Sequence, residues 1–92
     1  MKDLSAWRGE IDKLDREVVE LLNRRAQCVL ALAPMKRQQG RAVFDPTREQ
    51  SVLSNILASN AGPLADEALQ RIFKAVIAEM REMQEMQRER DS

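Results

Sequence analysis

Two cations interrupt an apolar pattern near the middle of this sequence. Arg25 stands between Leu21 and Cys28, where the helical repeat calls for an apolar residue. A guanidinium is rarely buried without an anionic partner, because its desolvation costs several kcal/mol. Lys36 follows eleven residues later, three helical turns on and therefore on nearly the same face. Two cations on one apolar face predict either internal ion pairs or a pocket for an anion.

Polar residues interrupt the apolar faces of two later segments in the same way. Glu49 lies on the inward face of the second segment with Arg48 beside it, and Gln84 lies one turn beyond Met80 in the third. One interpretation is an ion pair, such as Arg25 with Glu49, that holds the helices in register. Taken together, the set favours a polar, net-basic pocket inside a helical bundle, which suits an anionic ligand.

The composition narrows the chemistry that such a pocket can perform. The sequence has no histidine, no tyrosine and a single cysteine. Catalytic histidines, Ser-His or Cys-His pairs and the usual spacing of metal ligands are therefore excluded. Any catalysis must come from Lys, Arg, Asp, Glu, Gln and the backbone.

Charge and hydropathy also exclude several classes of partner. Lys and Arg number 15, as do Asp and Glu, so the formal net charge is zero. The sequence therefore lacks the basic excess that binding to nucleic acid or to an anionic membrane usually requires. The longest apolar run, residues 28–35, is too short to span a bilayer. The first ten residues contain no apolar signal core, and a lone Cys28 suits a reducing compartment, so we expect a cytoplasmic protein. Cys28 itself is predicted to pack as a small core residue.

The elements that would position these residues are three helices in a single domain over residues 1–92, predicted at about 4–37, 46–59 and 65–87. Gly40 is available to cap the first helix, and Asp45-Pro46 has the N-cap and first-turn residues of the second. A turn at residues 60–63 separates the second helix from the third. The charged tail, residues 87–92, is predicted to fray.

The first helix is too long for its own chain to cover. Its apolar stripe repeats at alternating spacings of three and four residues: Leu4, Trp7, Ile11, Leu14, Val18, Leu21, Arg25, Cys28, Leu32 and Met35. The helix would be ~50 Å long, whereas a compact chain near 100 residues has a radius of gyration of about 13 Å. An uncovered stripe would be an exposed apolar patch. We therefore predict an all-α protomer intertwined with a second copy in a homodimeric bundle.

Arg8 bears on how two such helices would run. It lies seventeen residues before Arg25, about 25 Å along the same helix, so one small ligand cannot contact both from one chain. Two antiparallel first helices would allow each chain to place its Arg8 in the other chain's pocket. A solvated surface position is the alternative for Arg8.

From Leu4 to about Met86, the sequence resembles the all-helical class of chorismate mutases. The matching residues are Trp7-Arg8-Gly9-Glu10-Ile11-Asp12-Lys13-Leu14-Asp15, Leu21-Leu22-Asn23-Arg24-Arg25, Lys36, Val43-Phe44-Asp45-Pro46-Thr47-Arg48-Glu49, Ile72-Phe73 and Gln84. The stretch Asp45 to Glu49, preceded at the right distance by Lys36 and Arg25, is the most specific part.

The resemblance implies a cofactor-free and metal-free isomerase that rearranges chorismate to prephenate in aromatic amino-acid biosynthesis. It implies that Arg25 and the partner's Arg8 hold the two substrate carboxylates, and that Glu49 binds the substrate hydroxyl. Lys36 and Gln84 would donate to the ether oxygen of the breaking bond. Asp45 and Arg48 would complete the substrate-binding wall.

Two residues depart from the pattern of this class. Pro34 lies inside the first helix by periodicity; it either kinks the helix and re-aims Lys36, or ends the helix early and leaves Lys36 on a looser segment. Met80 stands where many members carry a small or hydroxylated residue facing the substrate. It either narrows the substrate pocket or packs as core, and core packing is the favoured interpretation.

Two other functions fit the same residues. An isochorismate-pyruvate lyase shares this fold and a similar pocket, although Asp45 to Glu49 resembles the mutases more. A catalytically silent regulatory or scaffolding dimer is an alternative of a different class. Retention of the whole polar set disfavours it, because no structural need accounts for every member.

Overall fold

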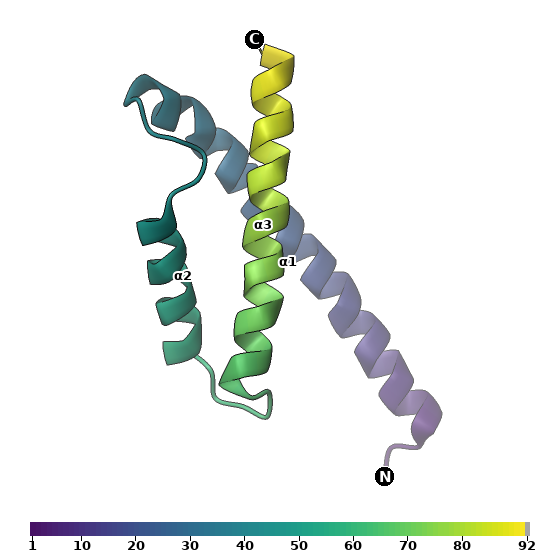
Figure 1. Cartoon of the computed structure of the whole chain (residues 1–92). Helices are drawn as coiled ribbons and strands as arrows, with labels where there is room; N and C mark the ends of the chain where they lie inside the picture. Colours follow the sequence, from purple (N-terminus) through teal and green to yellow (C-terminus); the bar gives the residue numbers. More distant parts are fainter. Residues whose placement is uncertain (92) are drawn as a thin grey trace.

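A computed structural model of the chain describes residues 1–91 and contains helices α1 (Leu4–Gln38), α2 (Pro46–Ala58) and α3 (Asp66–Asp91). No strand occurs within these residues. Figure 1 shows α2 and α3 side by side, while α1 crosses α3 and extends well beyond it. The predicted all-α protomer with three helices and one very long first helix is confirmed.

Local capping explains where α1 begins and ends. The Asp3 carboxylate accepts a hydrogen bond from the Ala6 amide at 2.8 Å, as an N-cap does. At the other end Gly40 has a φ of 69°, a conformation that costs glycine little. The amides of Gly40 and Arg41 donate to the carbonyls of Arg37 and Lys36, the pairing of a Schellman motif. The predicted capping role of Gly40 is confirmed.

Pro34 does not end α1. The helix continues for four residues beyond it and includes Lys36. The alternative in which Lys36 lies on a looser segment is therefore wrong. The basic residues Lys36 and Arg37 in the last turn favour this continuation, because they complement the negative end of the helix dipole.

The sequence between the first two helices also acts as predicted. The Asp45 side chain accepts a hydrogen bond from the Arg48 amide at 3.0 Å, and Pro46 occupies the first turn of α2. After α2, the Asn60 amide group donates to the Leu64 carbonyl and to the Asp66 carboxylate, which fixes the turn into α3.

α3 extends to Asp91, four residues beyond the predicted end at 87. The prediction of a frayed tail is wrong for residues 88–91, and Ser92 lies outside the described residues. Side-chain contacts account for the difference. Asp91 accepts from Arg37 of α1 at 3.5 Å and from Gln87 at 3.4 Å, and Arg88 lies 3.9 Å from Glu85.

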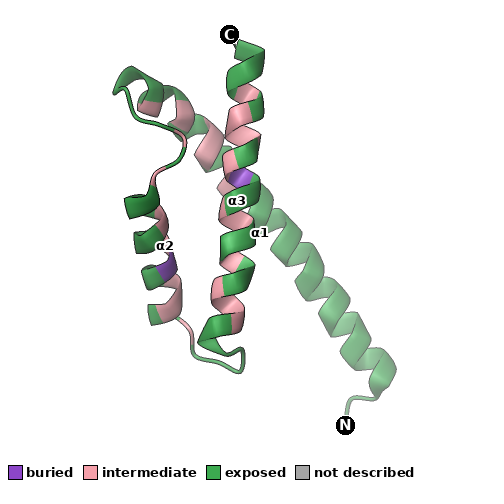
Figure 2. Cartoon of the chain, viewed as in Figure 1, coloured by how far each residue is buried: buried purple, intermediate pink, exposed green. Residues whose placement is uncertain are grey.

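Burial within the single protomer is slight. α3 packs against both α1 and α2, and only Leu53 and Met80 are buried among the described residues. Figure 2 shows the N-terminal half of α1 exposed throughout. Cys28 is exposed as well, so its predicted core position is wrong for the chain by itself. The partly buried residues of this part of α1 include its neighbours Ala26, Val29 and Leu30, which lie on an adjacent face.

The shape reflects the uncovered helix. The protomer measures 56 × 27 × 15 Å with a radius of gyration of 16.5 Å, against about 13 Å for a compact chain near 100 residues. Leu14, Val18 and Leu21 remain 51–58% exposed. Among the described helices, none is both long and apolar enough to cross a membrane.

Candidate active site

The polar residues predicted to form a pocket come together where three elements meet. A cavity of about 130 Å³ lies between the C-terminal half of α1, the start of α2 and the C-terminal half of α3. Its lining includes every predicted site residue except Arg8: Arg25, Lys36, Asp45, Arg48, Glu49, Met80 and Gln84. Val29, Leu32, Val52 and Ile77 supply apolar wall between them.

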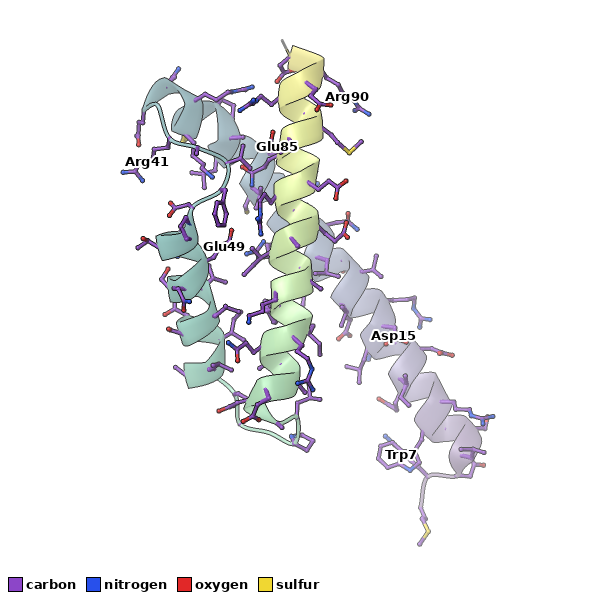
Figure 3. All side chains as sticks on the ribbon, viewed as in Figure 1. Trp7, Asp15, Arg41, Glu49, Glu85 and Arg90 are labelled. Carbon is purple, nitrogen blue, oxygen red and sulfur yellow. The ribbon has the colours of Figure 1, made fainter. Side chains whose placement is uncertain are left out.

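Arg8 lies elsewhere. It is exposed on α1 near the N-terminus, in the half of the helix that extends away from α2 and α3. In Figure 3, the labelled Trp7, which directly precedes Arg8 in the sequence, lies at the opposite end of α1 from the region of Glu49. The protomer therefore does not bring Arg8 to its own cavity, as the spacing from Arg25 requires.

Arg25 reaches across to α3. Its guanidinium donates to the Met80 sulfur at 2.7 Å, and both residues line the cavity. The predicted alternative of an Arg25–Glu49 ion pair is wrong. A thioether is a weak, uncharged acceptor, and Arg25 has no ion pair within residues 1–91. Its positive charge is therefore available to a ligand.

Met80 both packs in the core and lines the cavity, the two positions considered for it. It is one of the two buried residues, which confirms the favoured core packing, and it also lines the cavity. An unbranched side chain at this position fills space that a small or hydroxylated residue would leave open.

Lys36 joins α1 to the connecting segment. Its ammonium donates to the Val43 carbonyl at 3.2 Å. An ammonium has three N–H donors, so this bond fixes the side chain and leaves donors for a ligand. Gln84 lines the cavity from α3 and provides an amide donor that carries no charge.

Asp45 and Arg48 are already engaged at the start of α2. Asp45 caps the helix through the Arg48 amide, and the Arg48 guanidinium donates to the Ser51 hydroxyl at 3.3 Å. Arg48 is exposed and Asp45 is partly buried. Both residues also line a neighbouring hollow that continues the cavity outward between α1 and α2.

Glu49 has an ionic partner that was not among the predicted site residues, Arg81. Arg81 of α3 lies 3.5 Å from the Glu49 carboxylate and also lines the cavity. Figure 3 shows Glu49 in the space between α2 and α3. Arg81 follows Ile77 by four residues and precedes Gln84 by three, a spacing that places all three on one helix face. The helical periodicity of the third segment therefore places Arg81 on the same inward face as Gln84.

The charges of the lining favour an anion. Four cations, Arg25, Lys36, Arg48 and Arg81, face two carboxylates, Asp45 and Glu49, an excess of two positive charges. No serine, threonine, cysteine or histidine is among the lining residues. The site can hold a dianion and donate hydrogen bonds to it, and it offers no side chain for nucleophilic attack through a hydroxyl or thiol.

Most of the chain matches one family of known proteins. Residues 7–85 match the family described as chorismate mutase type II. The chain is 43% identical over 72 residues to a bifunctional chorismate mutase/prephenate dehydratase of Neisseria gonorrhoeae, covering 78% of this chain and 19% of that protein. The chain spans about one fifth of the length of the curated relatives it matches.

Solved structures resemble the whole three-helix arrangement. Form II of a chorismate mutase from Thermus thermophilus superposes with a TM-score of 0.87 at 30% identity, covering 91% of this chain and 96% of that one. A chorismate mutase from Helicobacter pylori in complex with prephenate gives a TM-score of 0.81 at 33% identity, with 89% of each chain covered.

Proposed function

Because this chain belongs to the chorismate mutase type II family, we propose that it rearranges chorismate to prephenate in the cavity between α1, α2 and α3. The observation that carries the proposal is the convergence of Arg25, Lys36, Glu49 and Gln84 on one net-basic cavity. The substrate is a dicarboxylate, and the excess of positive charge in the lining suits it.

The reaction explains the kinds of residue in the lining. The rearrangement is unimolecular: the ether C–O bond breaks as a C–C bond forms in the same molecule, with no proton transfer. The protein has only to hold the substrate in its compact reactive conformer and stabilise negative charge on the ether oxygen. Preorganised cationic and amide donors serve both purposes.

We assign the individual roles by position. Arg25 binds one carboxylate, and Lys36 and Gln84 donate to the ether oxygen. Glu49 accepts a hydrogen bond from the substrate hydroxyl, while Asp45 and Arg48 complete the wall. The link from Lys36 to the Val43 carbonyl supports this, because it holds the ammonium in place before the substrate arrives.

The second carboxylate requires a second copy of the chain. The apolar stripe along the N-terminal half of α1 is about half exposed in the protomer, and the cavity holds only about 130 Å³. In the proposed intertwined homodimer, antiparallel first helices cover each other's stripes. The partner's Arg8 then enters the cavity and binds the remaining carboxylate.

The loss of chorismate absorbance in the ultraviolet tests the activity directly. The purified chain should consume chorismate, and acid should convert the product to phenylpyruvate. A bicyclic dicarboxylate that mimics the transition state should bind much more tightly than chorismate. Absence of both turnover and mimic binding would contradict the proposal, and turnover of isochorismate alone would indicate the lyase instead.

Mixing two inactive variants tests the shared site. Arg8→Ala and Arg25→Ala should each lose activity alone. In a mixed dimer, one site has Arg25 from one chain and Arg8 from the other, so that site is intact. Exchange of subunits should therefore restore about a quarter of wild-type activity. No recovery after demonstrated exchange would contradict the contribution of Arg8 across the dimer.

A further inference from the structure

We infer that Arg81 is a positioning residue for Glu49, an inference that rests on the proposed function of the cavity. The Arg81 guanidinium lies 3.5 Å from the Glu49 carboxylate, across the boundary between α3 and α2. The Glu49 side chain is 25% exposed and that of Arg81 37%. The pair is therefore partly shielded from the solvent that weakens exposed ion pairs.

A second contact fixes Arg81 on the side of the connecting segment. Its guanidinium lies over the ring of Phe44, 4.7 Å from the centroid, within the range of a cation–π interaction. Phe44 directly precedes Asp45 and follows Val43, whose carbonyl binds Lys36. Arg81 thus contacts both α2 and the segment that leads into it, and the planar guanidinium is oriented before it meets Glu49.

The position of Arg81 leaves one of its own hydrogen-bond donors unsatisfied. Its Nε atom is buried and has no hydrogen-bond partner among the described residues. A buried donor left unpaired costs free energy. An apolar side chain would pack between α2 and α3 without that cost. The presence of a guanidinium here is explained if its function is to hold the Glu49 carboxylate in place.

The Glu49–Arg81 pair also separates two hollows of the protein. Glu49, Ile77 and Arg81 line the catalytic cavity, and the same three residues line a second hollow of about 320 Å³ on the outer side, next to Phe44. Without Arg81, the Glu49 carboxylate could turn toward this outer hollow and its water. Arg81 therefore keeps Glu49 directed at the cavity and offsets its charge where a dianionic substrate must bind.

The expected kinetic effect is on substrate binding. The substrate hydroxyl is present in both the ground state and the transition state, and an interaction common to both changes KM more than kcat. Arg81→Met keeps a long apolar side chain and removes the charge. We expect its KM for chorismate to rise about tenfold, the loss typical of one charged hydrogen bond, with kcat within about twofold of wild type.

Three further variants make the test specific. Arg81→Lys restores the cation and should recover most of the lost affinity. Glu49→Gln removes the group that is being positioned, so adding Arg81→Met to it should change KM by less than about twofold. Arg88→Met removes a similar Arg–Glu contact on α3, at 3.9 Å from Glu85 and outside the cavity lining. This control should leave KM unchanged.

Each contrary result has a distinct meaning. A lower melting temperature of Arg81→Met with wild-type KM would overturn the inference and make the pair merely structural. Equal losses with and without Glu49→Gln would overturn it in favour of direct contact between Arg81 and the substrate. Absence of turnover by the wild-type chain would contradict the proposed function itself, and the inference with it.

Discussion

The two halves of α1 differ sharply although one apolar repeat runs through both. Residues 4–24 are all exposed, and the ionic and cation–π contacts at this end are local, such as Lys2 with Glu10 and with the Trp7 ring. In the C-terminal half, Arg25 reaches Met80, Lys36 reaches Val43 and Arg37 reaches Asp91. Figures 1 and 2 show the first half standing away from α2 and α3.

The difference shows how one helix can serve two purposes. Where the stripe is purely apolar, it presents a surface that only another chain can cover. Where Arg25 and Lys36 replace apolar residues, the stripe contacts α3 and the connecting segment and encloses a cavity. Substitutions on the apolar stripe of the first half should therefore act on assembly, and substitutions at the cavity residues of the second half should act on activity.

The largest effect is expected from a charge in the N-terminal half. Leu14 is 55% exposed in the protomer, and an ordinary surface substitution changes stability by only about 0.5 kcal/mol. Within a dimer interface, Leu14→Glu would bury an unpaired carboxylate at a cost of several kcal/mol. We expect dissociation, measured by analytical ultracentrifugation, with loss of activity at both sites.

A matched control keeps the introduced residue and changes the face. Arg16→Glu places the same carboxylate on the side of α1 away from the stripe and should leave assembly unaltered. If Leu14→Glu sediments as the wild type does and remains active, the two halves of α1 do not differ in the way proposed.

At the cavity beside the C-terminal half of α1, the largest effect should come from the donors to the ether oxygen, Lys36 of α1 and Gln84 of α3. Lys36→Ala and Gln84→Ala should each reduce the rate by at least ~10²–10³, the typical loss for one preorganised donor. Circular dichroism should show the fold intact. Arg37→Ala and Gln87→Ala alter neighbouring side chains and should retain most activity. Near-normal turnover by either cavity variant would refute the assigned roles.

A smaller effect, on stability, is expected at Pro34. The proline cannot donate to the Leu30 carbonyl, and its ring crowds the preceding turn. Because α1 continues through it, Pro34→Ala should raise the free energy of unfolding by ~1–3 kcal/mol, measured by denaturant titration. Pro46→Ala, in the first turn of α2 where proline is favourable, should not stabilise. Equal responses of the two sites would mean that α1 has fully accommodated Pro34.

The smallest effect is expected at the exposed start of the chain. Lys2 lies 3.3 Å from Glu10 and 4.6 Å from the Trp7 ring centroid, but the side chains of the ion pair are 47% and 49% exposed. Solvent screening limits such contacts to at most ~1 kcal/mol. Lys2→Met should therefore change the melting temperature slightly and leave kcat/KM unaltered. A large loss of activity would show that the contacts of Lys2 matter to the active site, in contrast to the small effect expected here.

The sequence determines most reliably those features that depend on local chemistry. Asp45-Pro46 and Gly40 act within one helical turn of themselves, so their capping roles follow from residue type alone. Helical periodicity likewise placed Arg25, Lys36, Glu49 and Gln84 on inward faces, and the structure brings them to one cavity.

The contacts between helices required the tertiary structure. The sequence suggested Glu49 as the partner of Arg25, whereas the fold pairs Arg25 with Met80 and gives Glu49 to Arg81. The charged tail was predicted to fray, whereas Arg37 lies opposite Asp91 and the helix persists. Intervals within one helix are set by 3.6 residues per turn. The register between two helices depends on how their side chains pack, and only the folded chain determines it.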